Sequence, residues 1–222
     1  MKVFTVVGIT LSGKTTTIEN IIKELRKRGY SVGSVKEIHY EKFQIDTEGT
    51  NTYRHKEAGS QLVTARGFHE TDILFQEKLN IHDILKFYNY DYVVLEGVSD
   101  GSFPKIIAAS SEEEVLERLD ENTFAISGRI ANKIKDFKGL PVINAIEDVE
   151  KLVDLIEEKV EDYTFETYSI RLKIGEKDIK MVPFVQRALK NTILGFVKEL
   201  KGYEEGENIE IEIFPNYSKK NR

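Results

Sequence analysis

The stretch KVFTVVGITLSGKTT, residues 2–16, decides the fold of this chain. Residues 2–7 form a short apolar run rich in β-branched side chains, which is typical of a buried strand. The loop GITLSGKT, from Gly8 to Thr15, matches the spacing G-x-x-x-x-G-K-[ST]. A helical pattern over residues 15–28 follows at once. The order of strand, loop and helix predicts a phosphate-binding loop.

The residue types of this loop suit a phosphate chain. Its glycines permit tight turns, so that successive backbone N–H groups and the helix N-terminus can surround an anion. Lys14 is expected to contact the β- and γ-phosphates, and the Thr15 hydroxyl to bind Mg²⁺. The alternative is that this loop is an ordinary turn with an exposed lysine. We favour the phosphate loop, because the flanking strand and helix are predicted independently of the motif. The residues expected to bind the phosphates are Gly8, Leu11, Ser12, Gly13, Lys14, Thr15 and Thr16.

A second motif is YVVLEG, residues 92–97, an apolar strand that ends in an acid. This is the layout of a Walker B strand, with Glu96 where aspartate is commoner. A carboxylate there can hold Mg²⁺ or orient an attacking water, so Glu96 is a candidate metal ligand and catalytic residue. The alternative is that Glu96 caps a loop or pairs with a lysine.

The third region is residues 35–59. Lys36 lies at the exit of the second predicted strand, and Asp46 and Arg54 flank a turn at Gly49. Lys36 and Arg54 are candidates to neutralise phosphate charge, and Asp46 is a candidate metal ligand and catalytic carboxylate. Each could also be a solvated loop charge. We reject a histidine metal site, because the four histidines are dispersed and there is no cysteine.

The sequence from Asn132 to Asp136 resembles the guanine-reading motif N-K-x-D, but its acid comes one residue late. This stretch is also predicted to lie inside a helix rather than at a strand end, so we discard it. Asn144 follows the predicted strand at residues 141–143 and is the better candidate for contacting a nucleobase.

Apolar runs alternate with helical patterns over the first 160 residues. Predicted strands cover residues 2–7, 31–35, 61–65, 71–75, 92–95, 105–109, 123–126 and 141–143. Predicted helices cover residues 15–28, 52–58, 80–89, 111–119 and 149–156. A further short helix is predicted before residue 141. The pattern predicts an α/β fold of the P-loop NTPase type, with a mostly parallel sheet and helices on both faces.

Near residue 160 the pattern changes to alternating apolar and polar positions. The predicted elements there are strands at residues 164–174, 178–182 and 209–214 and a helix at residues 183–201. We therefore expect a nucleotide-binding domain at residues 1–160, a small α+β domain of ββαβ order at residues 163–217, and a polar tail at residues 218–222.

Composition narrows the function classes. The 222 residues include 32 Lys plus Arg against 38 Asp plus Glu, which gives a net charge of −6 and disfavours nucleic acid as a partner. The absence of cysteine excludes disulfides and thiolate chemistry. No apolar run reaches the roughly 18 residues of a membrane span, so neither a membrane partner nor a secretory leader is expected. The expectation is a cytoplasmic protein.

Five features occur in order along the chain: the phosphate loop, Lys36 followed by His39, the stretch IDTEGTNTYRHKEAG at residues 45–59, DYVVLEG at residues 91–97, and PKI at residues 104–106. Over about residues 1–160 the chain thereby resembles the MobB family, molybdopterin-guanine dinucleotide biosynthesis protein B. The resemblance implies a homodimer that binds GTP with Mg²⁺ and hydrolyses it weakly. It also implies a role in attaching a guanine nucleotide to molybdopterin, with a MobA-like nucleotidyltransferase and a target molybdoenzyme as partners.

The family's functional positions fall on the following residues: Gly8, Gly13, Lys14, Thr15 and Thr16 in the loop, and Lys36, Asp46, Gly49 and Glu96 beyond it. Departures lie elsewhere: Asn51 stands where the family has aspartate, Tyr40 where a second histidine is common, and Val98 and Ser99 where it has a Phe-Lys pair. These departures concern the contacts to the substrate more than the phosphate site.

Two other function classes remain open. A small-molecule kinase would use the same loop but needs arginines in a lid; Arg66 and Arg129 are candidates, although no arginine-rich run is present. A pure interaction protein would use the loop structurally and the C-terminal extension as its working part. Because no arginine finger is evident, any hydrolysis is expected to be slow.

Overall fold

The computed structural model describes residues 1–99, 101–164, 170–204 and 206–214. The chain divides into two compact units, Met1–Thr164 and Phe165–Arg222. The first unit contains the phosphate loop and the sheet that supports it.

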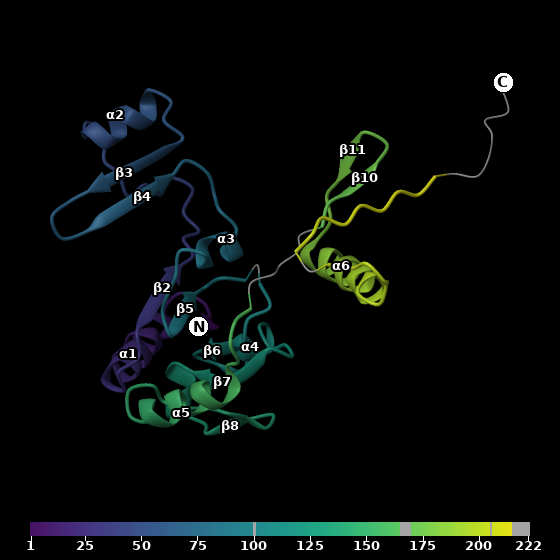
Figure 1. Ribbon diagram of the computed structural model, residues 1–222. Helices are drawn as coiled ribbons and strands as arrows, with labels where there is room; N and C mark the ends of the chain where they lie inside the picture. Colours follow the sequence, from purple (N-terminus) through teal and green to yellow (C-terminus); the bar gives the residue numbers. More distant parts are fainter. Residues whose placement is uncertain (100, 165–169, 205, 215–222) are drawn as a thin grey trace. The chain divides into compact units, whose positions relative to one another are not determined.

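Five parallel strands form the central sheet, in the order β2-β5-β1-β6-β7 (Figure 1). They are β1 (Lys2–Val7), β2 (Val32–Lys36), β5 (Tyr92–Glu96), β6 (Lys105–Ala108) and β7 (Thr123–Ser127). Glu96 is in register with Val6 of β1 and with Lys36 of β2. The carboxyl ends of these strands therefore meet at one edge, which places Lys36 and Glu96 beside the loop that follows β1.

Helices cover both faces of this sheet, as predicted. On one face, α1 (Lys14–Lys27) and α5 (Val149–Lys159) pack against alternate residues of the strands, such as Phe4 and Val6. The other face is covered by α3 (Ile81–Leu85), α4 (Glu112–Leu116) and the 3₁₀ helix η1 (Arg129–Asn132). Phe4 is fully buried, and burial of a side chain of that kind contributes about 1.5–3 kcal/mol.

The phosphate loop packs by its backbone against the ends of β6 and β7. A Cβ on Gly8 would lie 2.1 Å from the carbonyl oxygen of Ala108, and a Cβ on Gly128 would lie 2.4 Å from that of Ser12. The N–H of Arg129 also donates to the Ser12 carbonyl, at 3.2 Å. The loop is thus held by main-chain contacts that leave no room for side chains at either glycine.

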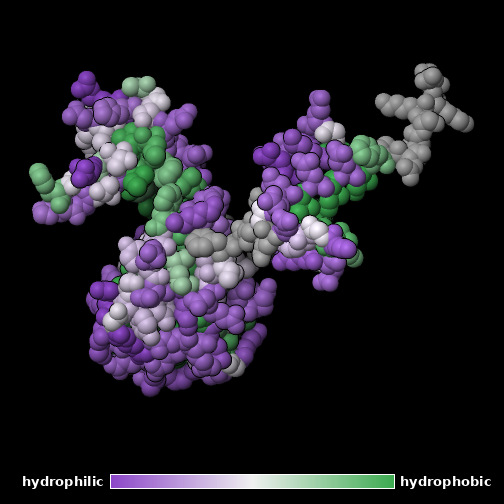
Figure 2. All heavy atoms as spheres, in the orientation of Figure 1, coloured by the Kyte–Doolittle hydropathy of each residue, from purple (hydrophilic) through white to green (hydrophobic). Residues whose placement is uncertain are grey.

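Residues 37–78 form an excursion between β2 and α3, which we call the arm. It holds α2 (Asn51–Glu57) and the antiparallel pair β3 (Leu62–Arg66) and β4 (Thr71–Phe75), which forms a sheet of its own. Val63 is the arm's buried residue. Hydrophobic residues gather on the arm surface (Figure 2). The exposed large ones are Ile38, Tyr40, Phe43, Ile45, Leu62, Phe68, Ile73 and Phe75.

The strand predicted at residues 141–143 is wrong in extent. The chain forms a short antiparallel hairpin, β8 (Asp136–Phe137) with β9 (Leu140–Pro141), and Val142 alone bridges to Ile126 in parallel. The tight turn between them contains Lys138 at φ 54° and Gly139 at φ 82°. The predicted helix before this point is reduced to η1, because the hairpin takes up the following residues.

Two helices are shorter than their sequence patterns. The helix predicted to reach residue 89 ends at Leu85, because Tyr88 turns toward β2 and its hydroxyl donates to the Ser34 carbonyl at 2.8 Å. The helix predicted to reach residue 119 ends at Leu116, and the ammonium of Lys105 binds the Arg118 carbonyl at 2.6 Å. In both cases a tertiary contact overrides the local pattern.

The second unit contains the antiparallel pair β10 (Leu172–Ile174) and β11 (Lys177–Ile179), followed by α6 (Pro183–Val197). The strand predicted at residues 209–214 is wrong: this segment has no strand partner among the described residues, and Ile213 is 90% exposed. Alternating apolar and polar residues alone do not make a strand, because a strand also needs a neighbouring strand to pair with. The predicted tail and residues 165–169 of the predicted strand at 164–174 lie outside the described residues.

In the part of the chain that the structure describes, no helix is both long enough and apolar enough to cross a membrane.

The packing of the phosphate loop yields a stability prediction. Gly128→Ala places a Cβ against the Ser12 carbonyl, whereas Gly139→Ala, at nearly the same φ (82° against 84°), meets nothing within 4 Å. We expect Gly128→Ala to lower the free energy of unfolding by about 1–3 kcal/mol more than Gly139→Ala, as an overpacked position does. Urea denaturation followed by circular dichroism measures both; equal losses would contradict the account.

Candidate nucleotide-binding site

A cleft of about 1230 Å³ opens at the carboxyl edge of the central sheet. This is the edge at which ligands bind in open α/β folds. The predicted site residues that line it are Gly8, Leu11, Gly13, Lys14, Thr15, Thr16, Lys36, Glu96 and Asn144. The cleft therefore unites residues from the phosphate loop, two further strand ends and the segment after β9.

The phosphate loop is arranged to receive an anion. The Lys14 ammonium donates to the carbonyls of Gly8 at 2.7 Å and Ile9 at 2.6 Å, so it lies inside the loop. Gly13 precedes α1 in the left-handed conformation and provides no side-chain cap. The first N–H groups of α1 consequently lack the usual capping oxygen and are available to a phosphate.

The surroundings of Lys14 shift the pKa of its ammonium group. Burial is the main cause that lowers the pKa of Lys14 below its ordinary value, and Lys36 and Arg118 lower it further, while the Glu96 carboxylate opposes the shift. A bound phosphate chain would add negative charge and favour the ammonium form.

Glu96 joins two of the predicted groups at one oxygen. Its Oε1 accepts hydrogen bonds from the Thr15 hydroxyl and from the Lys36 ammonium, each at 3.1 Å. The side chain of Glu96 is 14% exposed and that of Lys36 58%. The alternative in which Glu96 pairs with a lysine is therefore present. The Thr15 hydroxyl and the Glu96 carboxylate also lie together, and both offer oxygen ligands, which Mg²⁺ prefers.

Among the described residues, no three His, Cys, Asp or Glu side chains gather closely enough to hold a metal ion. A Mg²⁺ ion in the cleft would thus depend on Thr15, Glu96, water and phosphate oxygens together, which is the usual arrangement for this ion.

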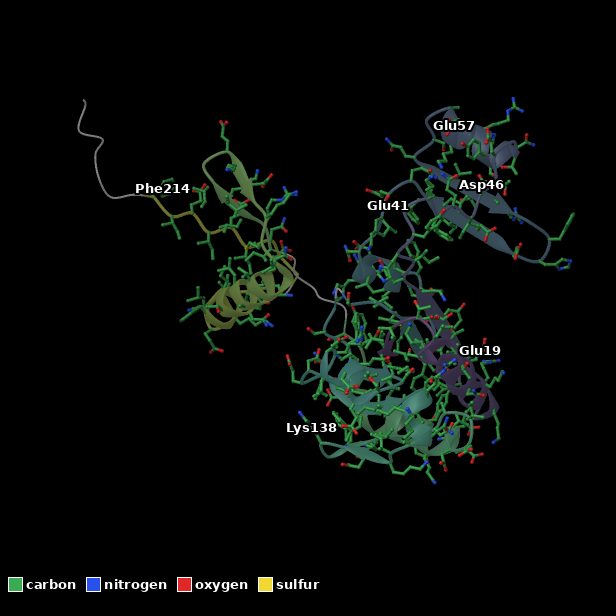
Figure 3. All side chains as sticks on the ribbon, turned by 180° about the vertical axis from the view of Figure 1, so that it is seen from behind. Glu19, Glu41, Asp46, Glu57, Lys138 and Phe214 are labelled. Carbon is green, nitrogen blue, oxygen red and sulfur yellow. The ribbon has the colours of Figure 1, made fainter. Side chains whose placement is uncertain are left out.

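Three predicted residues do not line the cleft. Ser12 is fully buried beneath the loop, where its hydroxyl donates to the Ile9 carbonyl at 2.9 Å. Asp46 and Arg54 belong to the arm, and Figure 3 shows Asp46 there beside α2.

Asp46 has a visible local role. Its Oδ1 accepts from the hydroxyls of Thr50 at 2.7 Å and Thr52 at 3.0 Å and from the Thr47 N–H at 2.9 Å. The Thr50 hydrogen bond is the main cause that holds the pKa of Asp46 below its ordinary value. Asp46 thereby organises the start of α2. Its metal role, and the phosphate role of Arg54, stay predictions.

The discarded region around Asn132 does reach the cleft. Asn132 ends η1 shortly after β7, and its Oδ1 accepts from the Asn144 amide at 2.9 Å. The Oδ1 of Asn144 accepts from the Ile146 N–H at 2.8 Å. Sequence reasoning missed Asn132 because it placed this residue inside a helix; its position soon after a buried strand was the available signal.

The cleft also continues beyond the predicted residues, along the face of the sheet that carries α3 and α4. Sequence reasoning assigned no role to the residues there, which include Val98, Phe103, Lys105 and Arg118. They were not grouped as a site, because they come from two loops and from the first residue of β6, which only the fold brings together.

Comparison with known proteins agrees with this geometry. The sequence model of the family described as MobB, molybdopterin guanine dinucleotide synthesis protein B, matches residues 3–128. A protein of Haemophilus influenzae described as a molybdopterin-guanine dinucleotide biosynthesis adapter protein is 30% identical, with 55% of this chain and 71% of that protein covered.

A Methanocaldococcus jannaschii protein provisionally described as an adapter of the same pathway is 27% identical over 96% of this chain and 97% of its own length. That alignment is long enough to include most of the second unit. The Bacillus subtilis protein with a similar provisional description is 29% identical over 65% of this chain and 86% of its own.

Solved structures show the same fold. The crystal structure of Bacillus subtilis MobB matches with a TM-score of 0.61 and 26% identity, over 73% of this chain and 100% of that one. A MobB homologue from Bacillus stearothermophilus matches with a TM-score of 0.53 and 25% identity, over 70% and 96% of the two chains. The family model covers more than half of the sequence, and the chain belongs to the MobB family.

Proposed function

We propose that this chain binds GTP with Mg²⁺ in the cleft and acts as an adapter in molybdopterin-guanine dinucleotide biosynthesis, assisting a MobA-like nucleotidyltransferase. The observation that carries the proposal is the convergence of Lys14, Thr15 and Glu96 beside a preformed phosphate loop. The names of the relatives support the pathway, and the phosphate loop supports the nucleotide.

Each residue has a task in this proposal. The Lys14 ammonium leaves the carbonyls of Gly8 and Ile9 for the β- and γ-phosphate oxygens, which offer it full negative charge. Thr15 and Glu96 would hold Mg²⁺, which when bound would neutralise charge on the phosphates. Lys36, no longer paired with Glu96, would be free to contact the γ-phosphate with its ammonium.

Two asparagines that line the cleft support binding of a base. Asn132 and Asn144 supply amide groups there, each with hydrogen-bonding capacity beyond the bonds described above. An amide can donate to the O6 atom of guanine and accept from its N1–H. An amide can pair with adenine as well, so our expectation that GTP binds more tightly than ATP rests on the resemblance to a family described by guanine dinucleotide synthesis.

Loss of the loop lysine should weaken nucleotide binding. Lys14→Ala removes a charge-assisted contact worth about 1.5–3 kcal/mol, so calorimetry with GTP and Mg²⁺ should show roughly a ten- to hundredfold higher Kd. Lys23→Ala is the matched control, since Lys23 is exposed on the same helix and does not line the cleft. Unchanged affinity of Lys14→Ala would contradict the site.

The Glu96 carboxylate should matter for turnover more than for binding. Glu96→Gln keeps the shape and one acceptor oxygen but removes the charge that would hold Mg²⁺ or orient water, so GTP hydrolysis should slow by roughly tenfold or more at similar GTP affinity. Glu19→Gln, an exposed acid on α1, is the control. Equal phosphate release from Glu96→Gln and wild type would contradict this role.

The arm supports a homodimer. A two-stranded sheet is marginal by itself in water, and this one presents Leu62, Ile73 and Phe75 to solvent on the face opposite Val63. We propose that this face packs against the same face of a second copy, as closed symmetry permits.

Single substitutions on the two faces of β4 test the dimer. Ile73→Lys should convert a dimer into a monomer in sedimentation equilibrium, because it buries a charge in the interface. Asp72→Lys, at the neighbouring position on the opposite face, should leave the dimer intact. A wild-type chain that sediments as a monomer at all concentrations would refute this proposal.

A further inference from the structure

The cleft is larger than the phosphate loop requires. Its volume of about 1230 Å³ exceeds the roughly 300–1,000 Å³ of a typical small-molecule site. The extra space follows from how the second face of the sheet is covered. One cluster, with α3, lies over Val3 and Leu95, and another, with α4 and η1, lies over Ile107 and Ile126.

Between these two clusters the strand β1 forms the floor of a groove. Thr5 lies on that floor, and its hydroxyl is within hydrogen-bond distance of the carbonyls of Leu95, at 3.2 Å, and Val98, at 3.1 Å. The loop after β5 forms one wall, and the turn after α4 forms the other. We call this space the second-face groove; it is lined by Thr5, Val98, Phe103, Lys105, Arg118 and Asn122.

Lys105 fixes one wall of the groove rather than offering a free charge. Its side chain is 11% exposed, and its ammonium is bound at 2.6 Å by both the Arg118 carbonyl and the Asp120 carboxylate. This cross-link holds the turn on which Arg118 lies, so the turn presents Arg118 from a rigid position.

Arg118 is the cation that the groove offers to a ligand. Its side chain is 26% exposed, and its Nη1 donates to the Glu114 carbonyl at 3.0 Å and to the Glu117 carboxylate at 2.9 Å. Among the described residues, no partner is assigned to its Nε and Nη2, and a guanidinium has five N–H donors. One edge of the fork is anchored, and the rest can bind an anion.

The groove and the phosphate loop share one electrostatic environment. Arg118 is close enough to Lys14 to contribute to the lowering of the pKa of that lysine. A ligand in the groove would therefore lie next to the phosphate end of a bound nucleotide.

We propose that the second-face groove binds a second small molecule that bears a phosphate monoester, with Arg118 as its anchor. A guanidinium fork matches the geometry of phosphate oxygens, and a phosphate monoester has close to two negative charges at neutral pH. The amide of Asn122 and the hydroxyl of Ser99 line the cleft and can donate further hydrogen bonds. The proposal depends on the proposed function in one respect only: it assumes that the nucleotide binds in the phosphate loop.

The test uses the full chain with its phosphate loop filled by a non-hydrolysable GTP analogue and Mg²⁺. Ligand-observed NMR then measures the binding of 4-nitrophenyl phosphate, with 4-nitrophenol and 4-nitrobenzoate as comparators. We expect the phosphate monoester to bind the nucleotide-loaded protein, and Arg118→Gln to raise its Kd roughly tenfold or more. Arg118→Lys should fall in between, because it keeps the charge but loses the fork. Arg66→Gln, on the arm, should change nothing.

Three results would overturn the proposal. They are the absence of 4-nitrophenyl phosphate binding to the loaded protein, equal binding of 4-nitrobenzoate, and binding that the nucleotide analogue displaces and Lys14→Ala abolishes. The last result would place the anion in the phosphate loop. Failure of the GTP analogue itself to bind is a separate outcome, which would refute the proposed function. The groove would then be tested with the unloaded protein: it should bind 4-nitrophenyl phosphate, and Arg118→Gln should abolish that binding.

Discussion

The site depends on the close approach of the phosphate loop to the ends of β6 and β7. Gly8 lies against the Ala108 carbonyl and Gly128 against the Ser12 carbonyl, so the contact is made by main chain on both sides. Such a contact cannot adjust as side-chain packing can, and it sets the direction of the loop's N–H groups before any ligand arrives. A preformed site loses less conformational entropy when it binds, and the same rigid frame positions Lys14 and Thr15 beside Glu96.

The Glu96 carboxylate in this frame is already paired. Lys36 contacts the Glu96 oxygen that also accepts from Thr15, so a cation occupies the place next to the hydroxyl–carboxylate pair. Under the proposed function, Thr15 and Glu96 would hold Mg²⁺, and Lys36 would then be free to contact the triphosphate. A mostly buried carboxylate is thereby paired in both states, which avoids the cost of leaving it unpaired.

Local sequence was sufficient where one short stretch determined the local structure. The strand, loop and helix from Lys2 to Lys27 form as predicted, and Glu96 ends a buried strand as its motif indicated. Long-range pairing was not predictable in the same way. The segment at residues 209–214 alternates correctly yet has no strand partner among the described residues. Arg118 reaches the cleft from a turn that no motif marks, and Asn132 reaches it from η1, within a motif-like stretch that was discarded. Asp46, which belongs to a motif, lies in the arm.

The most direct test of the central claim is a crystal structure of the full chain with a non-hydrolysable GTP analogue and Mg²⁺. The account predicts the triphosphate within the loop from Gly8 to Thr15, the Lys14 ammonium on the β- and γ-phosphates, and Lys36 separated from Glu96 by the metal site. A nucleotide bound elsewhere, with Lys14 still on the carbonyls of Gly8 and Ile9, would contradict it.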